Sequence, residues 1–156
     1  MRVVFGRNPR RTFIRLTLLV VVTIVLFKFF VIPIQVSGLS MNPSYIDGKV
    51  NFVNQLAYTW SKPKRGDVVA IRVPGERDML LKRIVGLPGE RVALLNGSVF
   101  INGHRLKEPY VALKSGYTMP ETPPLEPDFY FVIGDNRSVS VYFPVPAWHI
   151  VGKVLF

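Results

Sequence analysis

The chain of 156 residues contains no cysteine and only two histidines. The lack of cysteine excludes disulfide bonds, a cysteine nucleophile and thiolate zinc sites. With two histidines and no HExxH motif, we expect neither a metal centre nor a cofactor. A long amphipathic helix is also missing, whereas thirteen prolines and twelve glycines indicate many turns between short strands.

Acidic residues are absent from residues 1–34, which carry six of the ten net positive charges. Because the basic excess is confined to this end, and no aromatic–basic interleaving appears, we expect no nucleic-acid binding. The apolar run Leu16–Ile32 holds one charge, Lys28, and with its flanks approaches the ~30 Å of a bilayer core. A cleavable secretory signal is the alternative, but the run is long for one and no small-x-small site follows it.

Arginines before an apolar span place the N-terminus in the cytoplasm. We therefore expect residues 1–12 to form a basic cytoplasmic tail, residues 13–34 a transmembrane helix, and residues 35–156 an extracytoplasmic domain. A single anchor and a small domain fit a monomer in contact with the lipid bilayer.

After Ile34, short apolar runs alternate with turn residues. They predict strands at residues 67–73, 79–85, 91–95, 98–101 and 129–133. Asn96-Gly97 and Asn102-Gly103 each stand between apolar runs and predict type I′ hairpin turns. The proline-rich residues 108–128 are expected to form a long loop. This pattern predicts an all-β domain, an antiparallel and partly closed β-sheet or barrel.

Two residues in unusual local settings carry the chemistry. Ser40 closely follows the N-terminal apolar segment, and Lys82 lies within the apolar run Leu80–Val85. A serine hydroxyl is a weak nucleophile until a base takes its proton. A lysine can be that base only when neutral, and apolar neighbours lower its pKa toward neutrality. The pair predicts a Ser–Lys hydrolase at a membrane.

Four segments, in this order and spacing, resemble the bacterial type I signal peptidase (leader peptidase) family in a short, single-anchor form. A membrane anchor directly before the first segment is a fifth agreement. The match covers nearly everything after Ile34. The segments are Ser37-Gly38-Leu39-Ser40-Met41-Asn42-Pro43-Ser44, Arg65-Gly66-Asp67-Val68-Val69, Leu81-Lys82-Arg83-Ile84-Val85-Gly86-Leu87-Pro88-Gly89-Glu90 and Gly134-Asp135-Asn136-Arg137-Ser138-Val139-Ser140.

The resemblance implies roles for residues at the matching positions. Ser40 would be the nucleophile, Lys82 the general base, and Ser140 the serine that orients the lysine amine. Gly38 stands where many relatives have a serine that completes the oxyanion hole, so another donor must replace it. Three further residues would support the site: Arg83, Asp135 and Arg137.

The resemblance also implies the substrate and the location. The substrates would be signal peptides of secretory preproteins with Ala-x-Ala-like cleavage sites, cut outside the inner (plasma) membrane. The peptide would bind as an extended strand between residues 34–38 and 79–82. Apolar side chains would form shallow pockets for small residues there, and these are Ile34, Val36, Met41, Leu80 and Leu81.

The chain departs from the family pattern after Ser140. Relatives usually continue with an Asp-Ser-Arg segment and a glycine, whereas here Val141-Tyr142-Phe143 follows. Two alternatives stay open, the first because neither the dyad nor the anchor discriminates among Ser–Lys peptidases, and the second because of this missing segment. One is a specialised Ser–Lys processing peptidase, of pilin or organelle inner-membrane type. The other is a catalytically idle, membrane-anchored relative that binds exported chains.

Overall fold

The computed structural model describes residues 9–75, 78–113 and 115–155, without the side chains of residues 26–29. Within these ranges the chain forms one α-helix, α1 (Pro9–Phe30), followed by ten strands and a short 3-10 helix, η1 (Ala147–His149). The strands are β1 (Val31–Gln35), β2 (Val50–Asn54), β3 (Val68–Ile71), β4 (Leu80–Gly86), β5 (Val92–Leu95), β6 (Ser98–Ile101), β7 (His104–Arg105), β8 (Phe129–Ile133), β9 (Tyr142–Pro146) and β10 (Ile150–Val154).

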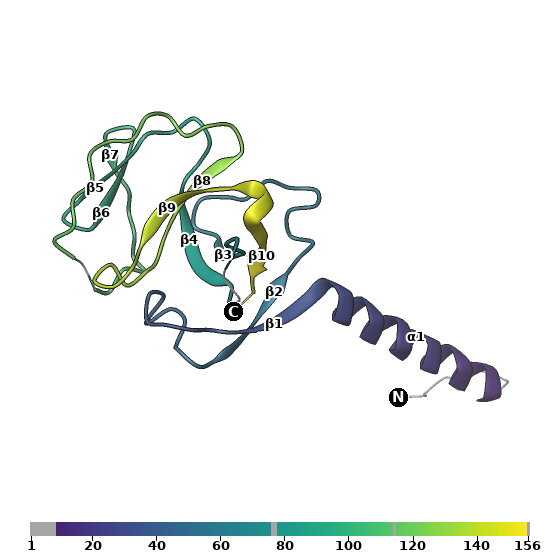
Figure 1. Cartoon of the computed structure of the whole chain (residues 1–156). Helices are drawn as coiled ribbons and strands as arrows, with labels where there is room; N and C mark the ends of the chain where they lie inside the picture. The colour runs from purple at the N-terminus through teal and green to yellow at the C-terminus, as the bar shows by residue number, and fades with distance from the viewer. Residues whose placement is uncertain (1–8, 76–77, 114, 156) are drawn as a thin grey trace.

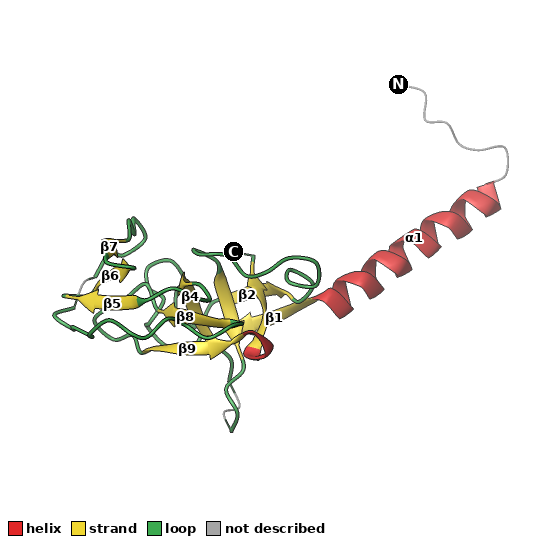
Figure 2. Cartoon of the chain, turned by 90° about the horizontal axis from the view of Figure 1, so that it is seen from above, coloured by secondary structure: helices red, strands yellow, loops and turns green. Residues whose placement is uncertain are grey.

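The strands form two antiparallel sheets (Figure 1). The larger has the order β1-β2-β10-β3-β4-β8-β9, and the smaller the order β5-β6-β7. The small sheet lies at the end of the β domain far from α1 (Figure 2). The prediction of an antiparallel β domain is therefore confirmed. The larger sheet is not closed into a barrel, because no pairing joins β1 to β9 among the described residues.

Strands β4 and β8 lie inside the larger sheet, between its β3 and β9 strands. All but the first residue of β8 are buried, as expected for the continuous apolar run Phe129–Ile133. Val85, Phe131 and Ile133 pack against the small sheet. On the other side of the molecule, Leu81 packs with side chains from β1, β2 and β3. The β4 strand therefore contributes to the cores on both sides of the candidate site.

The two Asn-Gly pairs form the turns of the small sheet, as predicted. Asn96 and Gly97 have φ of 49° and 72°, and Asn102 and Gly103 have φ of 50° and 78°. A type I′ turn requires positive φ at both central residues, which asparagine and glycine tolerate best. The first turn joins β5 to β6 and the second joins β6 to β7.

The N-terminal helix ends at Phe30, before the predicted boundary at Ile34. The chain becomes β1 instead, which pairs with β2 from Val31↔Asn54 to Gln35↔Val50. Pro33 cannot continue an α-helix, because it has no backbone N–H and its ring clashes with the preceding turn. The predicted boundary is therefore corrected to Phe30. Residues 1–8 of the predicted cytoplasmic tail lie outside the described residues.

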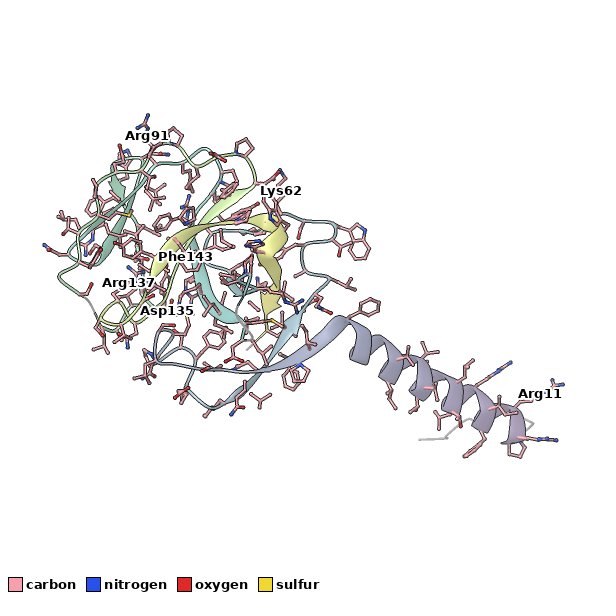
Figure 3. The ribbon with its side chains drawn as sticks, in the orientation of Figure 1. Arg11, Lys62, Arg91, Asp135, Arg137 and Phe143 are labelled. Carbon is pink, nitrogen blue, oxygen red and sulfur yellow. The ribbon has the colours of Figure 1, made fainter. Side chains whose placement is uncertain are left out.

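Helix α1 extends away from the β domain, with Arg11 near its far end (Figure 3). The side chains described along it, from Pro9 to Val25, are exposed. No helix among the described residues meets the combined length and hydropathy of a membrane span.

Candidate active site

Ser40 lies in the loop between β1 and β2, which hydrogen bonds hold in a fixed shape. The N–H of Val36 donates to the Lys49 carbonyl, and the N–H of Gly48 donates back to the Val36 carbonyl. At the tip, the Gly38 N–H donates to the Asp47 carboxylate at 2.8 Å. The chain then turns at Ser40, which is half-buried. We call residues 36–48 the nucleophile loop.

Lys82 reaches the nucleophile loop from β4. Its Nζ lies 2.7 Å from Ser40 Oγ, within hydrogen-bond distance. The lysine is only 3% exposed, and burial lowers its pKa from 10.5 to about 8. Among the described residues, no carboxylate bonds its amine. Burial without a counter-ion favours the neutral amine, whose lone pair can accept the serine proton.

The two edges of β4 are paired differently near Lys82. On one side, Lys82 lies opposite Val69 in β3. On the other side, β8 pairs with β4 only from Arg83↔Ile133 onward. Within the described part of the chain, the β4 edge at Leu80–Lys82 on this side therefore has no strand against it. A bare edge of this kind can bind an extended peptide by backbone hydrogen bonds.

Arg83 and Asp135 connect β4 to the segment that follows β8. Nε of Arg83 donates to Asp135 Oδ1 at 2.8 Å, and its second nitrogen donates to Oδ2 at 2.6 Å. The guanidinium also donates to the Gly66 carbonyl and lies over the Tyr110 ring, 4.1 Å from its centre. Asp135 is fully buried. This two-pronged ion pair fixes the residue next to Lys82.

Arg137 is buried in a second ion pair. Its guanidinium donates to Glu108 at 2.5 and 3.1 Å and to the carbonyls of Gly97 and Gly134. The side chains of Arg137 and Glu108 are 1% and 6% exposed. Sequence analysis singled out Arg137 but missed Glu108, which lies in the proline-rich loop with no motif to mark it.

Residues 134–140, which we call the post-β8 segment, lie against the nucleophile loop. The Asn136 N–H donates to the Ser40 carbonyl at 3.0 Å, and its side-chain amide donates to the Leu39 carbonyl at 3.1 Å. A Cβ on Gly134 would overlap the same Ser40 carbonyl. Sequence analysis did not assign a role to Asn136 or Gly134, although both lie inside the Gly134–Ser140 motif.

Ser140 lies close to the dyad but bonds other groups. Its hydroxyl accepts from the Gly134 N–H at 2.6 Å and donates to the Val141 carbonyl at 2.9 Å. No hydrogen bond between this hydroxyl and Lys82 is found among the described residues. The lysine-orienting role of Ser140 stays a prediction.

Four of the five predicted substrate-contacting residues gather in one apolar cluster. Ile34, Val36, Met41 and Leu81 are each 9% exposed or less and pack together. Leu80 is half-buried and packs instead in the cluster of Val69 and Ile71. Gly38 has φ of 93° and offers no side-chain donor. In the described ranges, no group of three His, Asp or Glu side chains could hold a metal ion.

A serine hydroxyl against a buried lysine amine, on a rigid antiparallel scaffold, has the geometry expected of a serine hydrolase. A family model described as signal peptidase, peptidase S26, matches residues 10–156. The chain belongs to this family.

Individual relatives agree with the family assignment. Signal peptidase I of Bacillus amyloliquefaciens is 38% identical over 131 residues, covering 78% of this chain and 70% of that protein. Signal peptidase IB of Staphylococcus aureus is 31% identical over 157 residues, covering 87% and 82%. The crystal structure of a signal peptidase I from Enterococcus faecalis V583 superposes with a TM-score of 0.52 at 30% identity, covering 61% of this chain and 98% of that one.

Proposed function

We propose that the chain is a serine endopeptidase that removes signal peptides from exported preproteins, with Ser40 as nucleophile and Lys82 as general base. The observation that carries this assignment of residues is the 2.7 Å contact between Ser40 Oγ and the buried Nζ of Lys82. Membership of the signal peptidase family supports the reaction. The same contact argues against a catalytically idle relative, because an unused lysine has no reason to be buried without a counter-ion.

The reaction uses the two side chains in turn. The neutral Lys82 amine takes the hydroxyl proton as Ser40 Oγ attacks the scissile carbonyl, and a tetrahedral oxyanion forms. The resulting ammonium then gives its proton to the leaving amine, and the C–N bond breaks to leave an acyl-enzyme. Water, activated by the same amine, hydrolyses that ester. Lys82 therefore acts as base and acid in alternate steps.

The backbone N–H of Ser40 is available for the oxyanion, because it has no hydrogen-bond acceptor among the described residues. Gly38 adds no second donor, since it has no hydroxyl and its N–H is bonded to Asp47. One oxyanion donor is worth ~2.7–4 kcal/mol of transition-state stabilisation. We propose that water or the substrate itself supplies the second donor here.

The substrate would bind as an extended strand between the bare β4 edge at Leu80–Lys82 and residues 34–38. The side chains of Ile34, Val36, Met41 and Leu81 already pack against one another. Because each is 9% exposed or less, we propose that they present only a small apolar surface to the substrate. Alternate residues of an extended strand face the same wall, so such a surface selects small residues at two alternate positions, as in Ala-x-Ala.

We propose that the enzyme works as a monomer at the inner (plasma) membrane, anchored once near its N-terminus, with a cytoplasmic tail and the β domain, residues 31–156, outside. The support comes from the apolar run Leu16–Ile32 and the basic residues before it. The exposed apolar side chains along α1, such as Phe13 and Leu19, fit contact with lipid. The preprotein would then be cut at the outer face of the bilayer.

The function is tested by incubating the purified full chain in detergent micelles with a secretory preprotein and identifying the new N-terminus. Cleavage after an Ala-x-Ala site is expected. Intact preprotein after prolonged incubation with folded enzyme would contradict the proposal.

The pH dependence tests the state of Lys82. Its pKa is lowered to about 8 by burial, and only the neutral form is active. Activity should therefore rise with pH, about tenfold per unit below pH 8, and level off above about pH 9. The measurement is kcat/KM on one preprotein from pH 6 to pH 10. If kcat/KM instead rose with a midpoint near pH 10.5, the ordinary pKa of lysine, the amine would not be desolvated when it acts.

A further inference from the structure

A cleft of about 540 Å³ opens beside the post-β8 segment, and the proposed catalytic steps do not involve it. It lies between the β5–β6 turn, residues 115–117 and residues 138–142. Figure 3 shows Asp135 and Arg137 between the large sheet and the small one, where these segments meet. Ser140 and Val141 are among the residues that line the cleft.

The cleft approaches the nucleophile loop at Gly134, because Ser140 lines the cleft and bonds this glycine. The Ser140 hydroxyl accepts from the Gly134 N–H at 2.6 Å. A Cβ added to Gly134 would overlap both the Ser140 side chain and the Ser40 carbonyl. Ser140, which lines the cleft, and the carbonyl of the nucleophile Ser40 therefore lie next to each other, on the same side of Gly134.

The direction of the bound strand leads to the cleft. If the signal-peptide residues lie along β4 before Lys82, the residues after the scissile bond must continue past Lys82 along the strand. There β8 already occupies the β4 edge, beginning with Arg83↔Ile133. The departing chain must leave the sheet at Gly134. The cleft begins at Ser140, which is bonded to that same residue.

The lining of the cleft favours an uncharged, apolar side chain. Leu94 and Ile133 are each 2% exposed and form its base. Tyr117 and Tyr142 form an edge-to-face pair, with ring centres 5.2 Å apart, along one wall. Arg137 also borders the cleft, but Glu108 and two carbonyls already bind its guanidinium. Among the described residues that line the cleft, no unpaired cation is therefore left to bind an acidic side chain.

We propose that this cleft binds an apolar or aromatic side chain from the first few residues after the cleavage site, on the mature part of the substrate. The proposal rests on the proposed function. It gives the enzyme a specificity element beyond the small residues before the cut. Because an apolar pocket discriminates about 10–200-fold, the preference it adds should be measurable without being absolute.

The test uses the full-length enzyme in micelles and preproteins with one signal peptide. Positions two, three and four after the cut are changed singly from glycine to phenylalanine. For the wild type, kcat/KM should rise at least tenfold for phenylalanine at one of these positions. Tyr117→Ala, at a side chain 57% exposed, should reduce that ratio to near one. Trp60→Ala is the matched control, because Trp60 is 86% exposed and does not line the cleft.

Val141→Asp is a second variant, since it places a carboxylate at the border of the cleft. This variant should lower the ratio of kcat/KM for the phenylalanine substrate to kcat/KM for the glycine substrate by a similar factor. An equal kcat/KM for phenylalanine and glycine at all three positions would overturn the proposal. So would a phenylalanine preference that both cleft variants keep. Failure of the wild type to cut any preprotein would overturn the proposed function itself, and the two failures are thus distinguished.

Discussion

Replacing Lys82 with methionine should reduce kcat on a preprotein by about 10⁴-fold or more while leaving the protein folded. The amine is the only base within hydrogen-bond reach of Ser40 Oγ among the described residues, at 2.7 Å. Without it, the hydroxyl has no proton acceptor when it attacks. Ser40→Ala should cause a loss of the same size. The double variant should be no worse than either single one, because residues that act as a unit show strongly non-additive effects.

The stability of Lys82→Met provides the control. A pKa lowered from 10.5 to about 8 means that, below pH 8, the folded state holds its ammonium at a cost. That cost is about 3 kcal/mol by the linkage between pKa and free energy, and it falls as pH rises from 8 to 10.5. Methionine removes it, so the melting temperature at pH 7 should be equal to or higher than that of the wild type. Activity within tenfold of the wild type would contradict the role of Lys82, and unfolding of the variant would contradict the predicted gain in stability.

Glu108→Ala should lower the free energy of unfolding by about 3–5 kcal/mol, because it leaves the Arg137 guanidinium buried without its carboxylate. The ion pair is nearly inaccessible to water, with side chains 1% and 6% exposed. Glu108 also accepts hydrogen bonds from the Val99 N–H and the Tyr110 hydroxyl. For a domain of this size, the melting temperature should fall on the order of 10–20 °C.

A matched control for this prediction is Glu121→Ala. Glu121 pairs with Arg91 at 4.0 Å, but these side chains are 43% and 52% exposed. Surface pairs of this kind contribute ~0–1 kcal/mol. Thermal unfolding of the two variants, followed by circular dichroism in the same detergent, should therefore give a large shift for Glu108→Ala and a small one for Glu121→Ala. Equal shifts would mean that the buried pair is not required to hold the post-β8 segment.

The strands predicted from the sequence correspond to β3, β4, β5, β6 and β8, because each has a local apolar pattern. The inner strands β2 and β10 had no such prediction. The apolar runs of β4 and β8 and the two Asn-Gly turns correspond to the observed elements. The edge strands β1 and β9 were missed because they contain prolines, which argue against strands except at the edges of sheets. The apolar start of β1 also continues the composition of α1, so the boundary at Phe30 is set by pairing with β2.

The residues around the dyad were harder to predict, because their partners are distant in sequence. Asp135 meets Arg83, and Arg137 meets Glu108 in a loop without a motif. Asn136 contacts the nucleophile loop once through its backbone N–H and once through its side-chain amide, and both acceptors are carbonyls almost a hundred positions away in the sequence. Burial of Lys82 was expected from its neighbours Leu80, Leu81 and Ile84. Leu80, however, packs on the opposite side from the predicted substrate surface.

Both outermost strands of the large sheet carry prolines, Pro33 in β1 and Pro144 and Pro146 in β9. A proline has no N–H to offer an additional strand, so neither rim is a good template for further pairing. The substrates of such an enzyme are unfolded polypeptides that can form strands, and these would pair with any exposed sheet edge that accepts a further strand. In the proposed binding mode, the substrate pairs instead with the inner stretch of β4 beside Ser40, and the prolines of both rims disfavour sheet-to-sheet pairing between two enzyme molecules.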